Sequence, residues 1–308
     1  MKKINIGVDV GGTTIHAGVV TDDGQIIKKI TSKTIVGQGS EIIIDTIIDS
    51  INVLLGTMSL AADTIGSIGI GFPGTVESSK GIVVFAPNIF FENVDVRSKI
   101  AQSFNCPIYL GQDSRAAAWA EYCVGAGTNC NNLAAITIGT GIGCGLIIDG
   151  KIFHGGYNTA GEFGHQLISP NGYPCNCGKK GCLETFSGGL AILREGKKID
   201  ANLNIQNVKD VYNLALQGNP GALDIADMVV VNLGIGMVNL INLMSLEMIT
   251  LSGGISNAPD SLLFDPLRKF VEEHAYSTVA KRIKIEHSPL GDDAGLIGAA
   301  LLDETTEF

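Results

Sequence analysis

The chain contains one supersecondary pattern twice, and this repeat limits the possible folds more than any other feature. Each copy has a short apolar strand, a glycine-rich turn, a second apolar strand and an Asp-Gly hairpin signal before a third strand. The first copy occupies residues 4–27 and the second residues 133–153. Two copies of one unit predict a duplicated α/β fold, with a related strand unit in each half.

The two glycine turns are candidate phosphate-binding sites. A glycine turn between strands exposes consecutive backbone N–H groups, and such concavities bind phosphate. Because neither turn opens a helix, the pattern differs from the dinucleotide-binding fingerprint. Asp9 lies two residues before Gly11, close to the first turn, and suits a contact with a metal-bound phosphate. A tight hairpin with a capping aspartate is the alternative. The predicted nucleotide-binding residues here are Asp9, Gly11, Gly12, Thr13, Thr14, Gly139, Thr140 and Gly141.

Composition excludes several classes of protein. The 308 residues are 45% hydrophobic and 17% charged, which allows a sizeable core. The formal net charge of −10 argues against nucleic acid as a partner, because tracking phosphates needs an excess of Lys and Arg. We find no apolar run long enough to span a bilayer, so no membrane association is expected. Seven cysteines, an odd number, fit a reducing compartment, and we expect a cytoplasmic protein.

One imidazole and three thiols fall within a short Gly/Pro-rich window, and they form a candidate metal site. They are His165, Cys175, Cys177 and Cys182. This is the ligand set of a closed tetrahedral zinc site, which is structural because it leaves no position for a catalytic water. A segment so rich in glycine and proline buries little apolar surface, so a metal could hold its shape. A loop with spare cysteines is the alternative.

Asp113 is the candidate catalytic residue. It follows a predicted strand at residues 107–110 and precedes an Ala-rich predicted helix at 114–122. The structural interpretation is an N-cap that accepts backbone N–H bonds. The functional interpretation is a base at the carboxyl end of a strand, where open α/β sheets bind ligands. The two interpretations are compatible, since phosphoryl transfer tolerates a weak base.

Apolar periodicity predicts further elements. We expect helices at residues 40–55, 222–243, 262–274 and 292–302, a helix and loop at 207–218, and strands at 65–72, 247–251 and 282–286. The last helix is expected to pack back on the N-terminal half. A third glycine turn, at Gly253-Gly254, follows the strand at 247–251.

The metal window and its flanks resemble the signature of the ROK family of bacterial sugar kinases and sugar-responsive repressors. The similarity lies in Gly161-Glu162-Phe163-Gly164-His165, the Cys-x-Cys-x4-Cys spacing and Leu183-Glu184. The resemblance covers nearly the whole chain. It implies an actin-like, ribonuclease-H-like ATPase fold with two lobes around a central cleft. We assign the small lobe to residues 1–112 plus about 292–308, and the large lobe to residues 113–291.

The resemblance also implies functional roles. Asp113 matches the family's catalytic aspartate, and Gly253 and Gly254 are similar to its adenosine-side motif. Asn88, in a Pro-Asn pair, would contact a sugar hydroxyl, although an ordinary turn residue is the equal alternative. The predicted sugar-binding residues are Asn88, Gln112, Glu162, His165 and Glu184. Gln112 departs from the family's glucose kinases, which have asparagine there, so its amide reaches one methylene further.

The expected function is ATP-dependent transfer of the γ-phosphoryl group to a primary hydroxyl of a hexose, glucose or a close relative. ATP, Mg²⁺ and a structural Zn²⁺ are the expected cofactors, and a homodimer is the family habit. The alternatives are a kinase for allose, fructose or an N-acetylhexosamine such as N-acetylmannosamine, and a sugar-sensing protein without turnover. ROK repressors carry an N-terminal winged-helix domain. Here the first predicted strand begins at Ile4, so we expect a kinase.

Overall fold

The computed structural model describes residues 4–200 and 203–307, which form two compact units. Unit 1 comprises residues up to 131, residues 145–160 and residues from 289 onward; unit 2 comprises residues 132–144 and 161–288. These units differ from the sequence-based lobes at residues 113–131, 145–160 and 289–291. The lobe boundaries stay a prediction.

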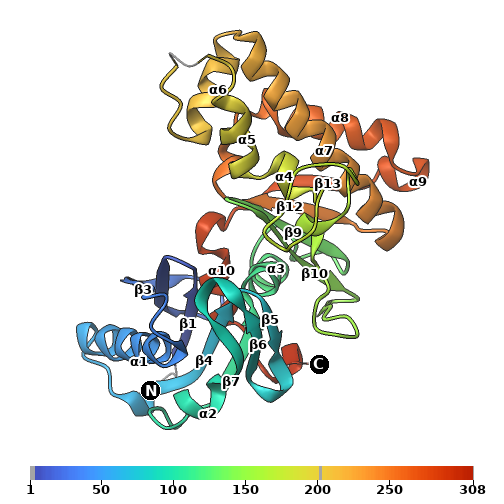
Figure 1. Ribbon diagram of the computed structural model, residues 1–308. Coiled ribbons are helices and arrows are strands. Elements are labelled where there is room, and N and C mark those ends of the chain that lie inside the picture. The colour runs from blue at the N-terminus through green and yellow to red at the C-terminus, as the bar shows by residue number, and fades with distance from the viewer. Residues whose placement is uncertain (1–3, 201–202, 308) are drawn as a thin grey trace. The chain divides into compact units, whose positions relative to one another are not determined.

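Unit 1 is built on a mixed five-stranded sheet with the order β3-β2-β1-β4-β8 (Figure 1). Its strands are β1 (Ile4–Val10), β2 (Thr14–Val20), β3 (Ile26–Lys33), β4 (Ile65–Phe72) and β8 (Ile108–Gln112). β2 pairs antiparallel with both β1 and β3, whereas β4 pairs parallel with β1 and β8. The predicted strand at residues 65–72 is confirmed at its stated bounds.

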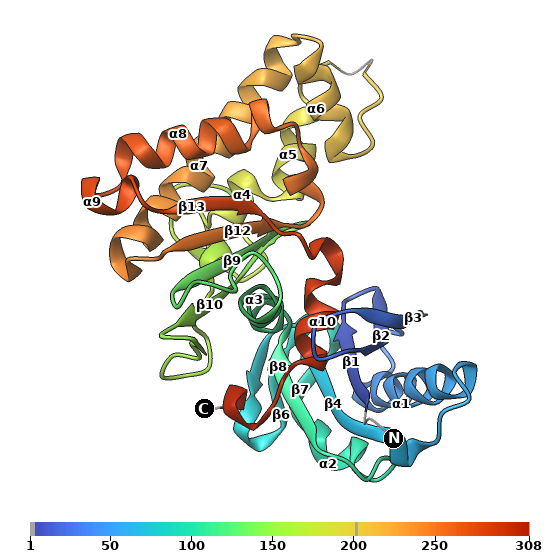
Figure 2. The same cartoon turned by 180° about the vertical axis from the view of Figure 1, so that it is seen from behind.

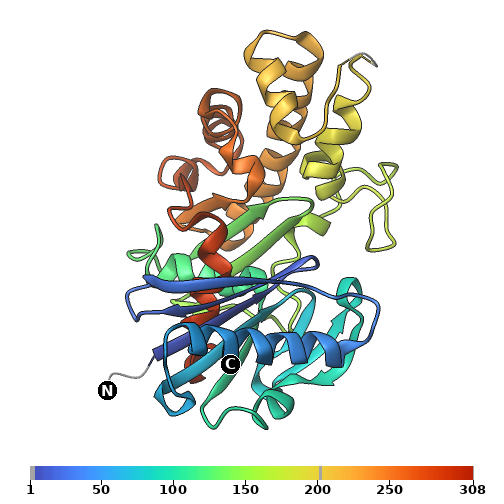
Figure 3. The same ribbon diagram turned by 90° about the vertical axis from the view of Figure 1, so that its left-hand side faces the viewer.

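Two helices cover opposite faces of this sheet because β1 alternates large and small side chains. Ile6 and Val8 are fully buried in a cluster with apolar residues of α1 (Ser40–Thr57), which lies along the sheet in Figure 3. Gly7 points the other way, and a Cβ there would collide with the Leu296 carbonyl of α10 (Ala294–Ala300). Close helix–sheet packing therefore needs glycine at this position. The predicted return of the last helix to the N-terminal sheet is confirmed.

An additional sheet in unit 1 was not predicted. It is antiparallel, with the order β5-β6-β7, and comprises β5 (Thr75–Glu77), β6 (Ile82–Ala86) and β7 (Phe91–Asp95). The short helix α2 (Val96–Ile100) follows it. Strands of three to five residues carry too little periodicity to stand out in the sequence. Helix α3 (Asp113–Cys123) then follows β8 as expected.

The second five-stranded sheet repeats the strand order of the first, as β11-β10-β9-β12-β13. Its strands are β9 (Leu133–Ile138), β10 (Ile142–Ile148), β11 (Lys151–Ile152), β12 (Met248–Ser252) and β13 (Lys284–His287). β12 pairs parallel with β9 and β13, and all five of its residues are buried. Burial on both faces is typical of a central parallel strand. The shared order confirms the duplicated α/β fold predicted from the repeat.

The helices of unit 2 lie between β11 and the end of the chain. They are α4 (Glu184–Ser187), α5 (Gly189–Gly196), α6 (Val208–Leu216), α7 (Pro220–Met244), α8 (Phe264–His274) and α9 (Ser277–Ala280). In Figure 2, α7 and α8 run beside each other on one side of β12 and β13. Helix α7 is long and apolar enough to cross a membrane by length and composition, which corrects the statement that no such run exists. Half of that apolar window is buried within the protein, and a single helix of this kind is weak evidence of a membrane span.

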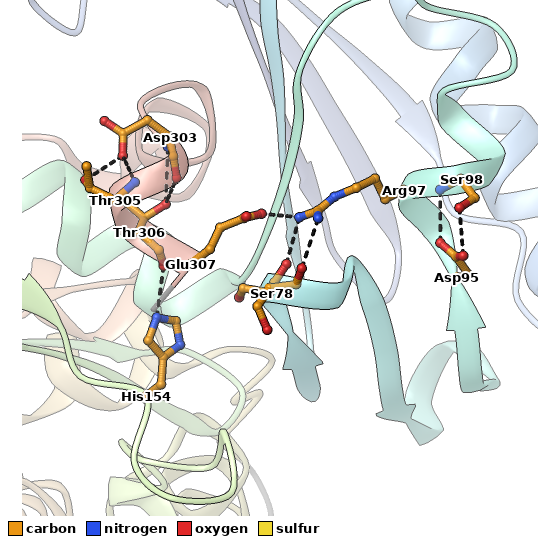
Figure 4. Close-up of polar contacts among 10 residues, drawn as sticks. Ser78, Asp95, Arg97, Ser98, His154, Asp303, Thr305, Thr306 and Glu307 are labelled. Atoms are coloured by element: carbon orange, nitrogen blue, oxygen red, sulfur yellow. Dashed lines mark hydrogen bonds and ion pairs between the residues drawn. The ribbon is translucent and has the colours of Figure 1, made fainter.

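The C-terminal segment is tied to unit 1 by polar contacts (Figure 4). Arg97 forms an ion pair with Glu307 and donates to the carbonyl of Ser78 at 2.7 Å. His154 Nε2 lies 2.9 Å from the carbonyl oxygen of Thr306. Burial and the nearby Arg115 guanidinium lower the pKa of His154, so a neutral ring with its proton on Nε2 can donate this bond.

Candidate active site

The first glycine turn presents its N–H groups outward because Thr34 holds its carbonyl groups. The Thr34 hydroxyl donates to the Gly11 carbonyl at 2.7 Å, and the Thr34 N–H donates to the Thr13 carbonyl at 2.9 Å. Gly11 N–H closes the turn onto the Thr14 carbonyl at 2.8 Å. Within residues 4–200 and 203–307, the N–H groups of Gly12 and Thr13 bond to no protein acceptor.

The second glycine turn has the same organisation, with α5 in the place of Thr34. Gly139 N–H closes the turn onto the Gly141 carbonyl at 3.0 Å. The Gly189 N–H donates to the Gly139 carbonyl at 2.8 Å, and the Leu190 N–H donates to the Thr140 carbonyl at 3.3 Å. In the described part of the chain, the N–H groups of Thr140 and Gly141 have no acceptor. Both turns thus offer paired donors suited to phosphate oxygens.

The third glycine turn lies beside the second. Gly253 has φ +86°, and a Cβ there would approach the Ile138 carbonyl oxygen to 2.7 Å. The Gly253 carbonyl accepts both the N–H and the hydroxyl of Ser256, at 3.0 and 2.8 Å. Gly254 is exposed. The structure therefore brings Gly253 and Gly254 next to the strand end from which Gly139–Gly141 emerge, as a single nucleotide site requires.

Two carboxylates approach each other at the ends of β1 and β8. A Cβ on Gly71 would lie 3.7 Å from Asp9 Oδ1 and 3.5 Å from Asp113 Cα, so both residues border the same glycine. Burial and the negative charge of Asp113 raise the pKa of Asp9 from 3.8 to about 7. A cation between these carboxylates would favour the ionised form of the buried Asp9 and offset its repulsion from Asp113. This suits a site for a metal-bound phosphate.

Asp113 is the first residue of α3, and the N-cap position belongs to Gln112, whose side chain makes no capping bond. Asp113 Oδ1 accepts the N–H and the hydroxyl of Ser114 at 2.6 and 3.0 Å. The predicted N-cap assignment is therefore displaced by one residue. Gln112 is buried, and its Oε1 has no partner among the described residues. Asn88 is exposed in a short 3-10 helix (Pro87–Ile89), also in unit 1.

The four predicted metal ligands converge in unit 2. One ligand atom from each of His165, Cys175, Cys177 and Cys182 lies within 4.8 Å of all the others. Cys175 Sγ is 3.6 Å from His165 Nδ1, and the Sγ atoms of Cys177 and Cys182 are 3.6 Å apart. Tetrahedral bonds of about 2.3 Å place ligand atoms roughly 3.8 Å apart, so the cluster is compatible with zinc.

His165 and two glutamates connect this cluster to the predicted sugar site. His165 directs Nδ1 toward the thiols and Nε2 toward Glu162, whose Oε2 is 3.7 Å away. Glu184 Oε1 accepts a 2.9 Å bond from the Cys175 thiol, while its Oε2 is directed at Gly141. The structure thus brings Glu162, His165 and Glu184 together, and it places Glu184 between the metal cluster and the second glycine turn.

The sequence did not reveal the residues that bind the second glycine turn and the loop carrying the metal ligands. Gly189 and Leu190 bind the second turn through backbone atoms, which leave no signature beyond a glycine pair. Arg194 covers the ring of Tyr173 in the metal loop, which we define as residues 165–182. An arginine on a short amphipathic helix looks like any exposed charge in the sequence, so only the fold identifies its partner.

Comparison with known proteins decides the family. A sequence model of the ROK family matches residues 5–306. The chain belongs to the ROK family. It is 35% identical over 316 aligned positions to a glucokinase of Halalkalibacterium halodurans, covering 98% of this chain and 95% of that protein. This ROK chain therefore has the duplicated actin-like ATPase fold that the resemblance implied.

Solved structures and repressors of the ROK family are also similar to the chain. A ROK glucokinase from Streptomyces griseus, in complex with glucose and AMPPNP, matches with a TM-score of 0.82 and 32% identity, covering 96% of this chain and 98% of that one. A xylose repressor of Caldicellulosiruptor bescii is 30% identical and matches 95% of this chain but 76% of the repressor. The similarity thus extends to both functional branches of the family.

Proposed function

We propose that the chain is an ATP-dependent hexose kinase that transfers the γ-phosphoryl group to a primary hydroxyl of glucose or a close relative. The observation that carries the proposal is the shared organisation of the two glycine turns. In each turn a neighbouring segment binds the carbonyl groups, so that adjacent N–H groups stay free for phosphate oxygens. A protein that only sensed sugar would need no such pair of turns.

Asp113 is the proposed general base. It orients the attacking hydroxyl and accepts its proton as the bond to the γ-phosphorus forms and the bond to the bridging oxygen breaks. The bonds from Ser114 fix one carboxylate oxygen of Asp113 and thereby the orientation of the side chain. Asp9 would hold the water shell of Mg²⁺, which supplies positive charge for the phosphates. Backbone N–H groups of both turns, with Gly253 and Gly254 on the adenosine side, would bind the nucleotide.

Glu162, His165, Glu184, Asn88 and Gln112 are the proposed sugar-binding residues. Carboxylate, amide and imidazole groups suit a neutral molecule rich in hydroxyls, whereas an anionic substrate would be repelled. His165, Cys175, Cys177 and Cys182 would hold zinc, which supplies a fixed shape to a loop with little apolar surface. With Nδ1 at the metal cluster, His165 keeps Nε2 for a hydroxyl.

A screen for ADP production tests the proposal. Purified protein with ATP and Mg²⁺ is assayed with glucose, allose, fructose, mannose and N-acetylmannosamine, because the longer amide of Gln112 leaves the choice of hexose open. We expect sugar-dependent ADP release with at least one hexose. A protein that binds hexose in calorimetry but releases no ADP with any of them would instead be a sugar sensor, like the repressor branch.

We also infer that the chain forms a homodimer in the cytoplasm and binds neither nucleic acid nor membranes. The net charge of −10 supports the exclusion of nucleic acid. Sedimentation equilibrium of the purified chain tests the dimer, and a mass of one chain across micromolar concentrations would contradict it.

A further inference from the structure

The geometry points to Arg194 as a positioning residue that holds the metal loop against α4 and thereby fixes His165 and Glu184. Its kinetic consequence rests on the proposed kinase activity, whereas its effect on metal retention rests only on the proposed zinc site. Three contacts of one guanidinium group and the position of α5, all within unit 2, support this role.

The first contact is with the metal loop itself. The Arg194 guanidinium carbon lies 3.5 Å from the centre of the Tyr173 ring, and the Lys198 ammonium lies 5.6 Å from it. The same ring packs against that of Phe186, with ring centres 5.7 Å apart and ring planes tilted by 57°. Tyr173 is two residues before the ligand Cys175, and its carbonyl accepts the Gly181 N–H at 2.8 Å beside the ligand Cys182. Holding Tyr173 therefore holds both ends of the thiol cluster.

The second contact is with the segment that carries Glu184. Arg194 Nη2 donates to the carbonyl of Thr185 at 2.9 Å, directly after Glu184 in α4. The third contact fixes the guanidinium: Arg194 Nε donates to Glu195 Oε1 at 2.8 Å, and Lys198 binds the other oxygen at 2.7 Å. A planar guanidinium can bind a carbonyl, a carboxylate and an aromatic face at the same time.

We call the three contacts of Arg194 the Arg194 clamp. The position of α5 connects this clamp with the second glycine turn. Its first residue, Gly189, binds the carbonyl of Gly139 in the second glycine turn, and Arg194 lies at its other end. The same eight-residue helix therefore contacts the predicted phosphate turn and the metal loop. The metal loop has little apolar burial of its own, so a half-exposed cation–aromatic pair is a large part of its packing.

Five variants of the zinc-loaded chain test the inference: Arg194→Ala, Arg194→Lys, Tyr173→Leu, the double variant Arg194→Ala/Tyr173→Leu and the matched control Arg268→Ala. Arg268 also lies over an aromatic ring in unit 2, 5.4 Å from Phe264, and also donates to a backbone carbonyl, that of Ile285 at 3.0 Å. Two quantities are measured for each variant. One is the rate of Zn²⁺ transfer to a chromogenic chelator, and the other is the set of steady-state constants for sugar and ATP.

We expect Arg194→Ala to raise the rate of zinc transfer and the KM for sugar about tenfold, with kcat and the KM for ATP within about threefold of wild type. Arg194→Lys keeps a charge over the ring and should recover part of both effects. Tyr173→Leu should resemble Arg194→Ala, and the double variant should add little, because both changes remove one contact. Arg268→Ala should leave zinc transfer unchanged.

The outcomes separate the two proposals. Equal zinc-transfer rates for Arg194→Ala, Arg194→Lys and Arg268→Ala would overturn the clamp, whether or not the chain is a kinase. Faster zinc transfer in a chain without sugar-dependent turnover would sustain the clamp and contradict the proposed function. If Arg194→Ala does not fold, Arg194→Lys and Tyr173→Leu carry the same comparison with Arg268→Ala.

Discussion

Oε2 of Glu184 lies 2.5 Å from the position that a Cβ atom on Gly141 would occupy. The other oxygen of this carboxylate accepts the 2.9 Å bond from Cys175. One side chain thus fills the space between a glycine of the predicted phosphate turn and a predicted metal ligand. A side chain at residue 141 would therefore compete with the Glu184 carboxylate for this space.

Gly141→Ala is therefore expected to displace the Glu184 carboxylate without disturbing the turn. Neither Gly139 nor Gly141 has a positive φ, so alanine fits the backbone at both positions. A Cβ on Gly139 meets nothing within 4 Å, which makes Gly139→Ala the matched control. We expect Gly141→Ala to lower kcat/KM for sugar roughly tenfold, about the loss of one charged hydrogen bond. Equal kinetics for the two variants would contradict this role of Glu184.

Asp113→Asn should lower kcat by about a thousandfold, because it removes a general base while keeping the shape of the side chain. Asp95→Asn is a close control. Asp95 also accepts the N–H and the hydroxyl of a serine at a helix start, here Ser98 at 3.0 and 2.7 Å (Figure 4). Thermal melts should show similar losses of stability for both variants, whereas steady-state kinetics should show a loss of turnover for Asp113→Asn alone.

The raised pKa of Asp9 predicts a pH dependence of stability. The folded-state pKa of about 7 exceeds the ordinary value of 3.8, so the folded chain retains a proton that the unfolded chain releases. Stability from this group is therefore present below pH 3.8 and decreases as pH rises to about 7. We expect Asp9→Asn to melt several degrees higher than wild type at pH 8, to show little difference at pH 4, and to lose activity.

That difference is measured by thermal unfolding of the nucleotide-free protein across the pH range. Mg²⁺ with ATP should narrow it for wild type, because positive charge favours the ionised form of Asp9. A difference in melting temperature that stayed constant from pH 4 to pH 8 would show that Asp9 is not a desolvated acid in the folded chain.

Arg97→Ala tests the attachment of the C-terminal segment. It removes the ion pair with Glu307 and the bonds to the carbonyls of Ser78 and Ser79, at 2.7 and 3.1 Å. It also leaves a largely buried carboxylate unpaired, since the Glu307 side chain is only 11% exposed. We expect a loss of about 2 to 4 kcal/mol in urea unfolding. Glu307→Gln, which can still accept a hydrogen bond, should cost clearly less, and an equal cost for the two would show that the buried charge is unimportant.

The sequence repeat was sufficient to predict the duplicated sheet, because the glycine turns and flanking apolar strands are local features. The strand at residues 65–72 has the predicted bounds, and β9 begins at residue 133, where the second copy of the repeat was predicted to begin. The metal cluster was also predictable, since its four ligands lie within eighteen consecutive residues. The contacts of Tyr173 with Arg194, of Gly141 with Glu184 and of Gly7 with Leu296 depend on tertiary packing, and sequence periodicity carries no information about them.

Predictions about single side chains were less complete because the surroundings of a side chain also depend on tertiary packing. Gln112 was assigned to the sugar from its position before Asp113, yet it is buried and its Oε1 lacks a partner in the described chain. Gln112 ends β8, which packs beside β5, and the sequence did not reveal the small sheet to which β5 belongs. Its reach toward a hydroxyl stays a prediction that the hexose screen addresses.

Phosphorus NMR of the reaction of ATP, Mg²⁺ and a hexose with the purified chain tests the central claim most directly. The account predicts a new sugar-phosphate resonance, split by two methylene protons because the acceptor is a primary hydroxyl, and it predicts that Asp113→Asn forms this product far more slowly. If the γ-phosphoryl group of ATP stays in place with every hexose, or appears only as inorganic phosphate, the account is contradicted.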